Sequence, residues 1–326
     1  MGSAVAATLL NSAQATNTGI RFTVLVSSYN YRDYVVDAVQ SAVDQSWPPH
    51  EVIVVDDGST DDSVHRLEAH FAHTPAVRIV RQANAGQLAA WMTGFALSSG
   101  DVVALLDSDD LWEPHYLATM AQAYQRHPSA DYVYCNMSLF GAREGVMLHR
   151  RRDRQDRDLG TSVLLGCFHP RWQGVATSGN TLRRELMARI LTLPADQVSQ
   201  WKTRPDDCLF YGADILGARK IYLATALARH REHTHNALLA DQRSAARRQQ
   251  YKMRRQLMLE YYRQLAHAGP ALLAEAAAEF RTKSHPTAKE CWLYLRMAAS
   301  APQSWGLRWA QIREITRHFL LHSTSR

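Results

Sequence analysis

The stretch that decides the fold of this chain is Val102-Val103-Ala104-Leu105-Leu106-Asp107-Ser108-Asp109-Asp110. Five apolar residues without polar alternation are typical of a strand that is covered on both faces of a parallel sheet. Three carboxylates follow directly, at the point where this strand ends. Ligands of open parallel sheets bind at the carboxyl ends of the strands. The stretch therefore predicts a central strand and the centre of a binding site together.

The segments around this stretch alternate between strands and helices. We predict strands over 22–27, 51–55, 77–80, 102–106 and 132–135, a weaker strand over 221–226, and helices over 33–45, 61–71, 86–98, 114–126, 183–192 and 205–216. Apolar residues three and four apart, as in Val35, Ala38, Val39 and Ala42, indicate helices. Such alternation indicates an α/β fold with a mostly parallel sheet flanked by helices.

Beyond residue 240 long helical patterns replace this alternation, over 241–266, 270–281, 287–299 and 304–322. We predict a disordered leader over 1–19, an α/β domain over 20–239 and a helical C-terminal region over 240–326. Within the domain, 20–116 is expected to bind a nucleotide and 117–239 an acceptor.

Composition indicates a soluble globular protein with a basic C-terminal region. Hydrophobic residues make up 46% and charged residues 21% of the chain. The net charge of +6 is uneven, because 240–326 contains fifteen Lys and Arg against six Asp and Glu. Four cysteines, all far apart in sequence, indicate buried thiols in a reducing, cytosolic setting. No apolar run reaches the roughly 18 residues of a membrane span.

Polar side chains follow three of the predicted strands. Ser27, Ser28, Tyr29 and Asn30 follow the first strand, Asp56 and Asp57 the second, and the three aspartates the fourth. We expect five carboxylates at one sheet edge with no Lys or Arg nearby, a repulsion that a divalent cation relieves. Aspartate oxygens suit Mg²⁺ or Mn²⁺, which commonly bind substrate phosphates as well. An aromatic ring beside a carboxylate suits a flat base.

Each segment alone also has a purely structural interpretation. Asp56-Asp57-Gly58 is compatible with a simple turn, and 107–110 with the acidic start of a helix. Three carboxylates in four residues exceed what a helix start needs, and the order of the segments favours a site.

Taken together, these segments resemble family 2 of the inverting glycosyltransferases, which have the GT-A fold. The resemblance rests on Ser27-Ser-Tyr-Asn30, Val54-Val-Asp-Asp-Gly-Ser-Thr-Asp61, Asn84-Ala-Gly-Gln87 and Leu106-Asp-Ser-Asp-Asp110. It is specific over about 22–116 and fainter to about 237. One departure is Ala90-Trp91-Met92, where many relatives have Ala-Arg-Asn; the missing Arg removes an expected contact.

The resemblance implies a donor site and a metal ligand. The donor residues are Ser27, Tyr29, Asn30, Asp57, Gln87, Asp107 and Ser108. Ser27 and Tyr29 would line the pocket for base and ribose, and Asp57 would bind the base edge. Asp109 would hold Mn²⁺ or Mg²⁺ at the diphosphate.

The acceptor side follows from the same resemblance. Asp110, Ser178, Gly179 and Asp206 would lie near the sugar or the acceptor. Asp207, in an acidic pair at a helix start, aligns with the catalytic base, and His233, in Arg231-Glu-His-Thr-His-Asn236, with a late metal ligand. In structural terms, the acidic pair can complement a helix dipole, Ser178-Gly179 can be a plain loop, and His233 a surface histidine.

We therefore predict an inverting transferase that moves a sugar from a UDP- or dTDP-type donor to a hydroxyl of a saccharide or lipid-linked acceptor, in surface polysaccharide or glycolipid synthesis. The alternative is a non-catalytic module that binds nucleotide sugars. An oxidoreductase is disfavoured because no Gly-x-Gly-x-x-Gly follows the first strand. A nucleotidyltransferase would need a glycine-rich basic loop there, and a receiver-like pocket would carry its acidic pair after the first strand.

Two further segments remain open. The charged segment 150–158 can be a lid over the donor or a solvated loop. The C-terminal helices combine Arg with Trp and Tyr, which suits the inner face of a membrane in a cytoplasmic, peripheral protein. Packing on the domain or in a homodimer is the alternative. No nucleic-acid recognition motif is present, and no nucleic-acid partner is expected.

Overall fold

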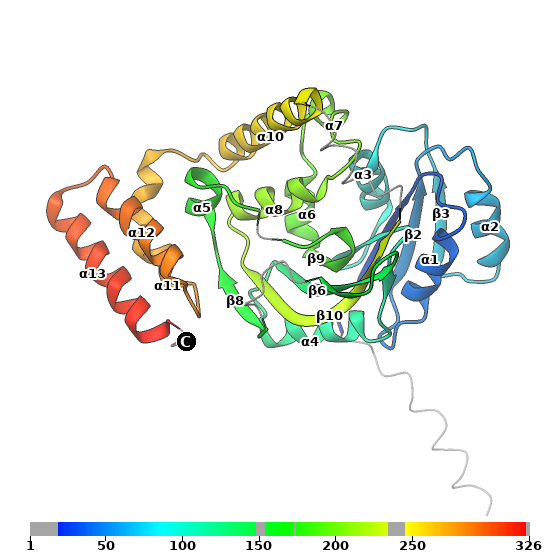
Figure 1. Ribbon diagram of the computed structural model, residues 1–326, viewed down its shortest axis with the longest axis horizontal. Coiled ribbons are helices and arrows are strands. Elements are labelled where there is room, and N and C mark those ends of the chain that lie inside the picture. Colours follow the sequence, from blue (N-terminus) through cyan, green and yellow to red (C-terminus); the bar gives the residue numbers. More distant parts are fainter. Residues whose placement is uncertain (1–18, 148–153, 173, 234–244, 324–326) are drawn as a thin grey trace, which may run out of the picture.

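A ten-stranded sheet forms the centre of this protein in its computed structural model, which describes residues 19–147, 154–172, 174–233 and 245–323 (Figure 1). The strands are β1 (Phe22–Ser28), β2 (Glu51–Asp56), β3 (Val77–Arg81), β4 (Val102–Asp107), β5 (Leu111–Trp112), β6 (Tyr132–Gly141), β7 (Gly145–Met147), β8 (Arg157–Gly160), β9 (Asn180–Arg183) and β10 (Lys220–Glu232). The predicted leader lies outside the described residues except for Gly19.

The strand order is β3-β2-β1-β4-β9-β6-β10-β5, with β7 paired to β6 and β8 to β10. The pairs among β3, β2, β1 and β4 are parallel, and β10 is parallel to β6. Between these two parallel groups, β9 runs antiparallel to both neighbours. The predicted α/β architecture with a central sheet flanked by helices is confirmed, but the sheet is mixed rather than mostly parallel, because β5, β7, β8 and β9 add antiparallel pairs to the parallel groups.

Helices cover both faces of the sheet in the domain. They are α1 (Val35–Val43), α2 (Ser63–His70), α3 (Gln87–Leu97), α4 (Tyr116–Arg126), α5 (Val163–Phe168), α6 (Arg184–Ile190), α7 (Ala195–Val198) and α8 (Asp206–Ile215), with the short 3₁₀ turn η1 (Thr177–Gly179). The four apolar positions of α1 that predict a helix are its buried residues. Strands β1, β2 and β4 are buried almost throughout, as their unbroken apolar runs require.

The C-terminal region consists of α10 (Ala245–Leu265), η2 (Pro270–Glu275), α11 (Ala276–Arg281), α12 (Ala288–Ser300) and α13 (Trp305–His322). Two cores hold these helices. Met258, Leu259 and Tyr262 of α10 belong to the core of the sheet, and α11 to α13 form a second core with α5. Among the described helices, none combines the length and apolar content of a membrane span. The division near residue 240 stays a prediction.

Two segments differ from the sequence expectation. The loop predicted over 150–158 contains the start of β8, because Arg157 and Asp158 pair with β10 and the Asp158 carboxylate accepts hydrogen bonds from Arg219. Residues 150–153 lie outside the described residues. Strand β10 is longer than predicted, since register shifts between Leu223 and Ala228 let it continue to Glu232.

Candidate active site

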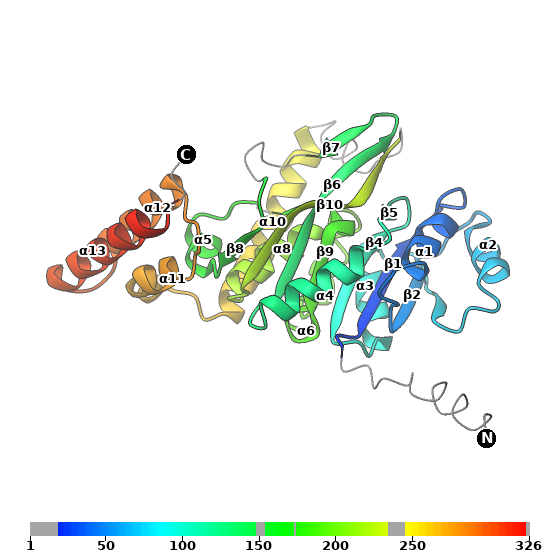
Figure 2. The same cartoon turned by 90° about the horizontal axis from the view of Figure 1, so that it is seen from below.

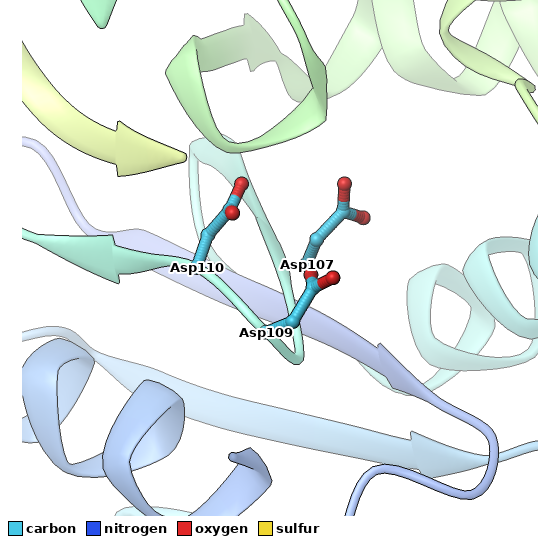
Figure 3. Close-up of side chains that lie close together, drawn as sticks. All are labelled: Asp107, Asp109 and Asp110. Carbon is cyan, nitrogen blue, oxygen red and sulfur yellow. The ribbon is translucent and has the colours of Figure 1, made fainter. Parts of the chain in front are cut away.

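The three aspartates after β4 gather at the carboxyl end of the central strand. One carboxylate oxygen each of Asp107, Asp109 and Asp110 lies within 4.8 Å of the others. Figure 3 shows the three side chains on the turn that leads from β4 to β5. The turn is closed by the Asp110 N–H, which donates to the Asp107 carbonyl at 3.1 Å. The sequence prediction that these carboxylates meet is confirmed.

Asp110 is the most deeply held of the three. Its side chain is fully buried, and it accepts hydrogen bonds from Ser178 Oγ at 2.6 Å and from the Arg231 N–H at 2.9 Å. His230 Nδ1 lies 3.1 Å from Asp110 Oδ1. Since a buried carboxylate is costly without partners, these three groups explain why Asp110 can sit inside the protein.

Ser178 connects two of the aspartates. Its hydroxyl donates to Asp110 and accepts the Asp107 N–H at 3.0 Å, while its carbonyl accepts Trp112 Nε1 at 2.7 Å. Gly179 follows in η1, where an added Cβ would lie 2.7 Å from a Val175 methyl. The Ser-Gly turn predicted on the acceptor side therefore supports the acidic turn directly.

Burial and mutual repulsion perturb the carboxylates. Burial, with the charges of Asp110 and Asp109, raises the pKa of Asp107 well above its ordinary value. Burial and Asp110 also raise the pKa of Asp109, against a hydrogen bond from His233. Burial lowers the pKa of His230, but the hydrogen bond with Asp110 and the three carboxylate charges outweigh it and raise it to about 9.

Basic side chains from the end of β10 do lie beside this cluster, and the expectation that none is near is wrong. Arg231 Nε donates to the Asp109 carbonyl at 2.8 Å. His233 Nε2 lies 2.8 Å from Asp109 Oδ2, with its ring stacked on Tyr34 at 5.5 Å. His233 is therefore next to Asp109, as its predicted metal role requires, and that role stays a prediction. His235 and Asn236 lie outside the described residues.

This arrangement fits a divalent cation. Hard ions such as Mg²⁺ and Mn²⁺ take oxygen ligands, and carboxylate oxygens within 4.8 Å of one another can share one ion. Burial and the neighbouring carboxylates raise the pKa values of Asp107 and Asp109, so their ionised forms are disfavoured without a further positive charge. A bound cation would supply that charge.

The predicted donor residues surround the cluster on the side of β1. Gln87, at the start of α3, donates through Nε2 to Asp107 Oδ1 at 2.6 Å and to Ser27 Oγ at 3.3 Å. Tyr29 is 45% exposed beyond the end of β1, where a flat base can reach its ring. Ser108 is buried in the turn. Asn30 instead ties two loops together, since its Oδ1 accepts the Thr60 N–H at 2.8 Å.

The loop before α3 holds the carboxylate of Asp57. Its carboxylate accepts hydrogen bonds from Gln82 Nε2 at 2.7 Å and from the N–H groups of Ala85 at 2.9 Å and Gly86 at 2.8 Å. Its neighbour Asp56 is buried, and its Oδ1 has no hydrogen-bond partner within the described residues. Of the donors that the structure describes, only the Gly86 N–H reaches Asp57 Oδ2, so this carboxylate keeps room for one further N–H, and its predicted contact with the base edge stays a prediction.

The acidic pair on the acceptor side begins α8, as the sequence predicts. Asp207 is fully buried, and its Oδ2 accepts a 2.6 Å hydrogen bond from Tyr251 Oη of α10. Asp206 is partly exposed, and its negative charge contributes to the raised pKa of Asp107. Burial and the charge of Asp207 raise the pKa of Asp206 to about 7. Of the two residues, Asp206 is the more exposed to solvent.

Three residues of the site were not singled out from the sequence. His230 directly precedes the motif that contains His233, and Arg231 is the first residue of that motif. The length of the strand was not known from the sequence, so neither side chain could be placed beside the aspartates. Tyr251 lies in the C-terminal helices, 44 residues after Asp207. No periodicity in a sequence links such distant positions, so their contact follows only from tertiary packing.

Comparison with known proteins supports the resemblance seen in the sequence. Residues 23–189 match the description "Glycosyl transferase family 2". The chain is 31% identical over 224 residues to an uncharacterized glycosyltransferase of Nostoc sp., covering 67% of this chain and 66% of that protein. It is 36% identical over 111 residues to chondroitin synthase of Escherichia coli, covering 34% of this chain and 16% of that one. The chain thus spans less than two thirds of the length of these relatives.

Solved structures show the same fold. S. aureus TarS residues 1–349 in complex with UDP matches with a TM-score of 0.54 and 17% identity, over 93% of this chain and 90% of that chain. The complex with UDP-GlcNAc matches with a TM-score of 0.53 and 15% identity, over 93% and 74%. With the acidic turn at the end of β4 and a family match over half of its length, this chain belongs to glycosyl transferase family 2.

Proposed function

We propose that this protein transfers a sugar from a UDP- or dTDP-type nucleotide sugar to an acceptor hydroxyl, with inversion at the sugar carbon. The observation that carries the proposal is the cluster of Asp107, Asp109 and Asp110 at the carboxyl end of β4 in a family 2 fold. TarS, which shares the fold, has been crystallised with UDP and with UDP-GlcNAc. Chondroitin synthase and a succinoglycan biosynthesis protein are among the relatives, which favours a saccharide or lipid-linked acceptor in polysaccharide synthesis.

The residues around the cluster have distinct tasks in this proposal. Asp109, with His233 beside it, would hold Mn²⁺ or Mg²⁺, which supplies Lewis-acid stabilisation of the departing diphosphate. Gln87 orients Asp107 toward the donor, and Ser27 and Tyr29 border the nucleotide. Ser178 fixes Asp110 near the transferred sugar, so the carboxylates keep their positions without the substrate.

The base that removes the acceptor proton is one of the pair at the start of α8. The motif alignment points to Asp207, but the geometry favours Asp206. Asp207 is buried and hydrogen-bonded to Tyr251, whereas Asp206 is partly exposed with a pKa near that of an effective base at neutral pH. We therefore assign the proton transfer to Asp206 and a positioning role to Asp207.

A thermal-shift experiment tests the donor site. UDP with Mn²⁺ should raise the melting temperature of the wild type, since a ligand at 100 times its Kd stabilises a protein by about 2.7 kcal/mol. Asp109→Ala should lose this shift, and Asp206→Asn should keep it. Asp37→Ala, which removes an exposed carboxylate of α1, is the matched control and should behave as the wild type.

A turnover assay separates the transferase from the non-catalytic alternative. The wild type should release UDP from a UDP-sugar in the presence of Mn²⁺, and it should do so faster with a suitable saccharide acceptor. NMR of the product should show the anomeric configuration opposite to that of the donor sugar. Nucleotide binding without turnover for any donor tested would instead support a binding module.

A further inference from the structure

Helix α13 carries large apolar side chains on the side that faces away from the protein. Trp305 is 73% exposed, Trp309 64% and Leu320 73%. The opposite side of the same helix is held in the second core through Ile315, and Gln311 Oε1 accepts the Ala277 N–H. One side of α13 therefore packs against the second core, and the other side is exposed on the surface of the folded protein.

The exposed side of α13 is also cationic. Trp305, Trp309, Arg313, Thr316 and Leu320 recur every three or four residues and share one face, with Arg317 and Leu321 beside it. A shallow groove on this face is lined by Arg313, Thr316, Arg317, Leu320 and Leu321. The single acidic residue of the helix, Glu314, pairs with Arg281 at 2.6 Å and so does not neutralise this face. We call this surface the α13 face.

Guanidinium groups lie against the exposed indole rings in this region. Arg308 lies over Trp305 at 5.2 Å, and Arg296 of α12 lies over Trp292 at 4.7 Å. Trp292 is itself 54% exposed. The exposed rings of Trp305 and Trp292 are thus accompanied by positive charge within reach of the same partner.

The α13 face is remote from the active site. Figures 1 and 2 both show α13 at the end of the molecule opposite to β1, β2 and β3. Contact between a partner and this face would leave the carboxylate cluster uncovered.

We propose that the α13 face binds the surface of an anionic phospholipid bilayer. Tryptophan side chains prefer the boundary between lipid headgroups and acyl chains. Basic amphipathic helices bind anionic lipid, and each Lys or Arg near such a surface contributes about 1 kcal/mol. A second copy of the chain is a poorer partner, because symmetric pairing would place two cationic faces against each other, and Glu314, the one acidic residue of the helix, already pairs with Arg281. This proposal goes beyond the sugar transfer and does not depend on it.

Vesicle co-sedimentation tests the proposal on the full chain. The protein should bind vesicles of phosphatidylcholine with phosphatidylglycerol and remain in the supernatant with phosphatidylcholine alone. Binding should weaken as salt rises, because salt screens the attraction between arginines and lipid phosphates. Failure to bind the anionic vesicles at low salt overturns the proposal.

Two double variants assign the binding to the α13 face. Trp305→Ala with Trp309→Ala, and Arg313→Glu with Arg317→Glu, should each lower the partition coefficient at least about tenfold, a loss that corresponds to about 1.4 kcal/mol. Circular dichroism should remain that of the wild type, because these side chains are exposed.

Matched controls change the same chemistry elsewhere. Met253→Ala with Leu257→Ala removes exposed apolar side chains of α10, and Arg78→Glu with Arg126→Glu reverses exposed charges on β3 and α4. Both should bind vesicles as the wild type does, and an equal loss in either control overturns the assignment. Asp109→Ala should also bind, which separates lipid binding from the proposed transfer.

If Trp305→Ala with Trp309→Ala instead converts a dimer to a monomer in light scattering without vesicles, the face is an interface between copies and the lipid proposal is wrong.

Discussion

At the residue scale, the hydroxyl of Ser178 holds the acidic turn in shape. Ser178→Ala removes the donor to Asp110 and leaves the Asp107 N–H without its acceptor. An unpaired buried polar group costs about 1 to 3 kcal/mol, and we expect the free energy of unfolding to fall by that amount. The Mn²⁺ concentration for half-maximal UDP-induced stabilisation should rise about tenfold, which corresponds to about 1.4 kcal/mol of lost metal affinity.

Ser41 provides the matched control for this prediction. Its hydroxyl also bridges two groups, since it donates to the Ala38 carbonyl at 2.7 Å and accepts the Trp112 N–H at 3.1 Å, but it touches none of the three aspartates. Ser41→Ala should lower stability and leave the Mn²⁺ dependence unchanged. If both variants change the metal dependence equally, Ser178 has no specific role in the cluster.

A second prediction at this scale concerns Asp206. A base must be ionised to accept a proton, and burial with the charge of Asp207 raises the pKa of Asp206 to about 7. Transfer should therefore be lost below this pH and should reach a plateau above it, in a profile of kcat/KM against pH. Asp206→Asn should lower kcat by roughly 10² to 10⁴, the usual range for loss of a general base.

Asp207 gives the contrast. Asp207→Asn retains a side chain that can pair with Tyr251, so it should lower kcat far less than Asp206→Asn and leave the pH profile in place. A larger loss in Asp207→Asn than in Asp206→Asn would return the base to Asp207.

Single residues were predictable from the sequence where they sit at strand ends. Parallel strands place their carboxyl ends at one edge, which put Ser27 of β1 beside Asp107 of β4 as expected. Chain order does not tell which hydrogen bonds a side chain makes. Asp57 proved to be engaged by its own loop, and Asp207 by a tyrosine from another region.

At the element scale, long apolar strands and amphipathic helices were predicted within a few residues. The sequence did not reveal β5, β8 or β9, which have two to four residues and acquire strand geometry by pairing with a longer neighbour. Their pairing decides the acceptor half, because β9 joins β4 to β6. Short strands lack enough residues for a periodic pattern.

The turn between β3 and α3 allows a prediction about an element as a whole. Gly86 has φ of +96° and its N–H donates to Asp57, while a Cβ there would lie 2.5 Å from Lys202 Cα. Gly86→Ala should therefore displace the turn, weaken UDP binding and lower the free energy of unfolding by at least about 1 to 3 kcal/mol, as overpacking does. Calorimetric titration with UDP and a urea melt measure the two effects.

Gly269 is the matched position without these constraints. It has φ of −145°, and an added Cβ meets no atom within 4 Å. Gly269→Ala should leave UDP binding and stability close to those of the wild type. Equal effects in the two variants would mean that the backbone conformation of Gly86 is not what matters.

At the scale of the whole molecule, the two cores are joined by polar contacts as well as apolar ones. Lys283, in the link between α11 and α12, is buried against the domain. Its Nζ donates to the carbonyls of Leu159 at 3.1 Å and Thr161 at 3.0 Å and to Ser162 Oγ at 3.1 Å. Its charge also lies near Glu279, which is buried in the second core. One side chain thus connects β8 and the start of α5 to the C-terminal helices.

Lys283→Met keeps a side chain of similar length and removes the positive charge and the three N–H donors of the ammonium group. Three acceptors and the Glu279 carboxylate then lose a partner inside the protein, and removal of one member of a buried charged network costs about 3 to 5 kcal/mol. Because the loss falls on the second core, amide hydrogen exchange in 276–323 should accelerate while exchange in β1, β2 and β4 stays slow. UDP-induced stabilisation should persist, since the acidic turn belongs to the other core.

Lys289→Met is the control, because Lys289 is exposed on α12, and its amide hydrogen exchange should equal that of the wild type. Unchanged exchange in Lys283→Met, or acceleration in both cores together, would show that the C-terminal helices do not depend on this connection.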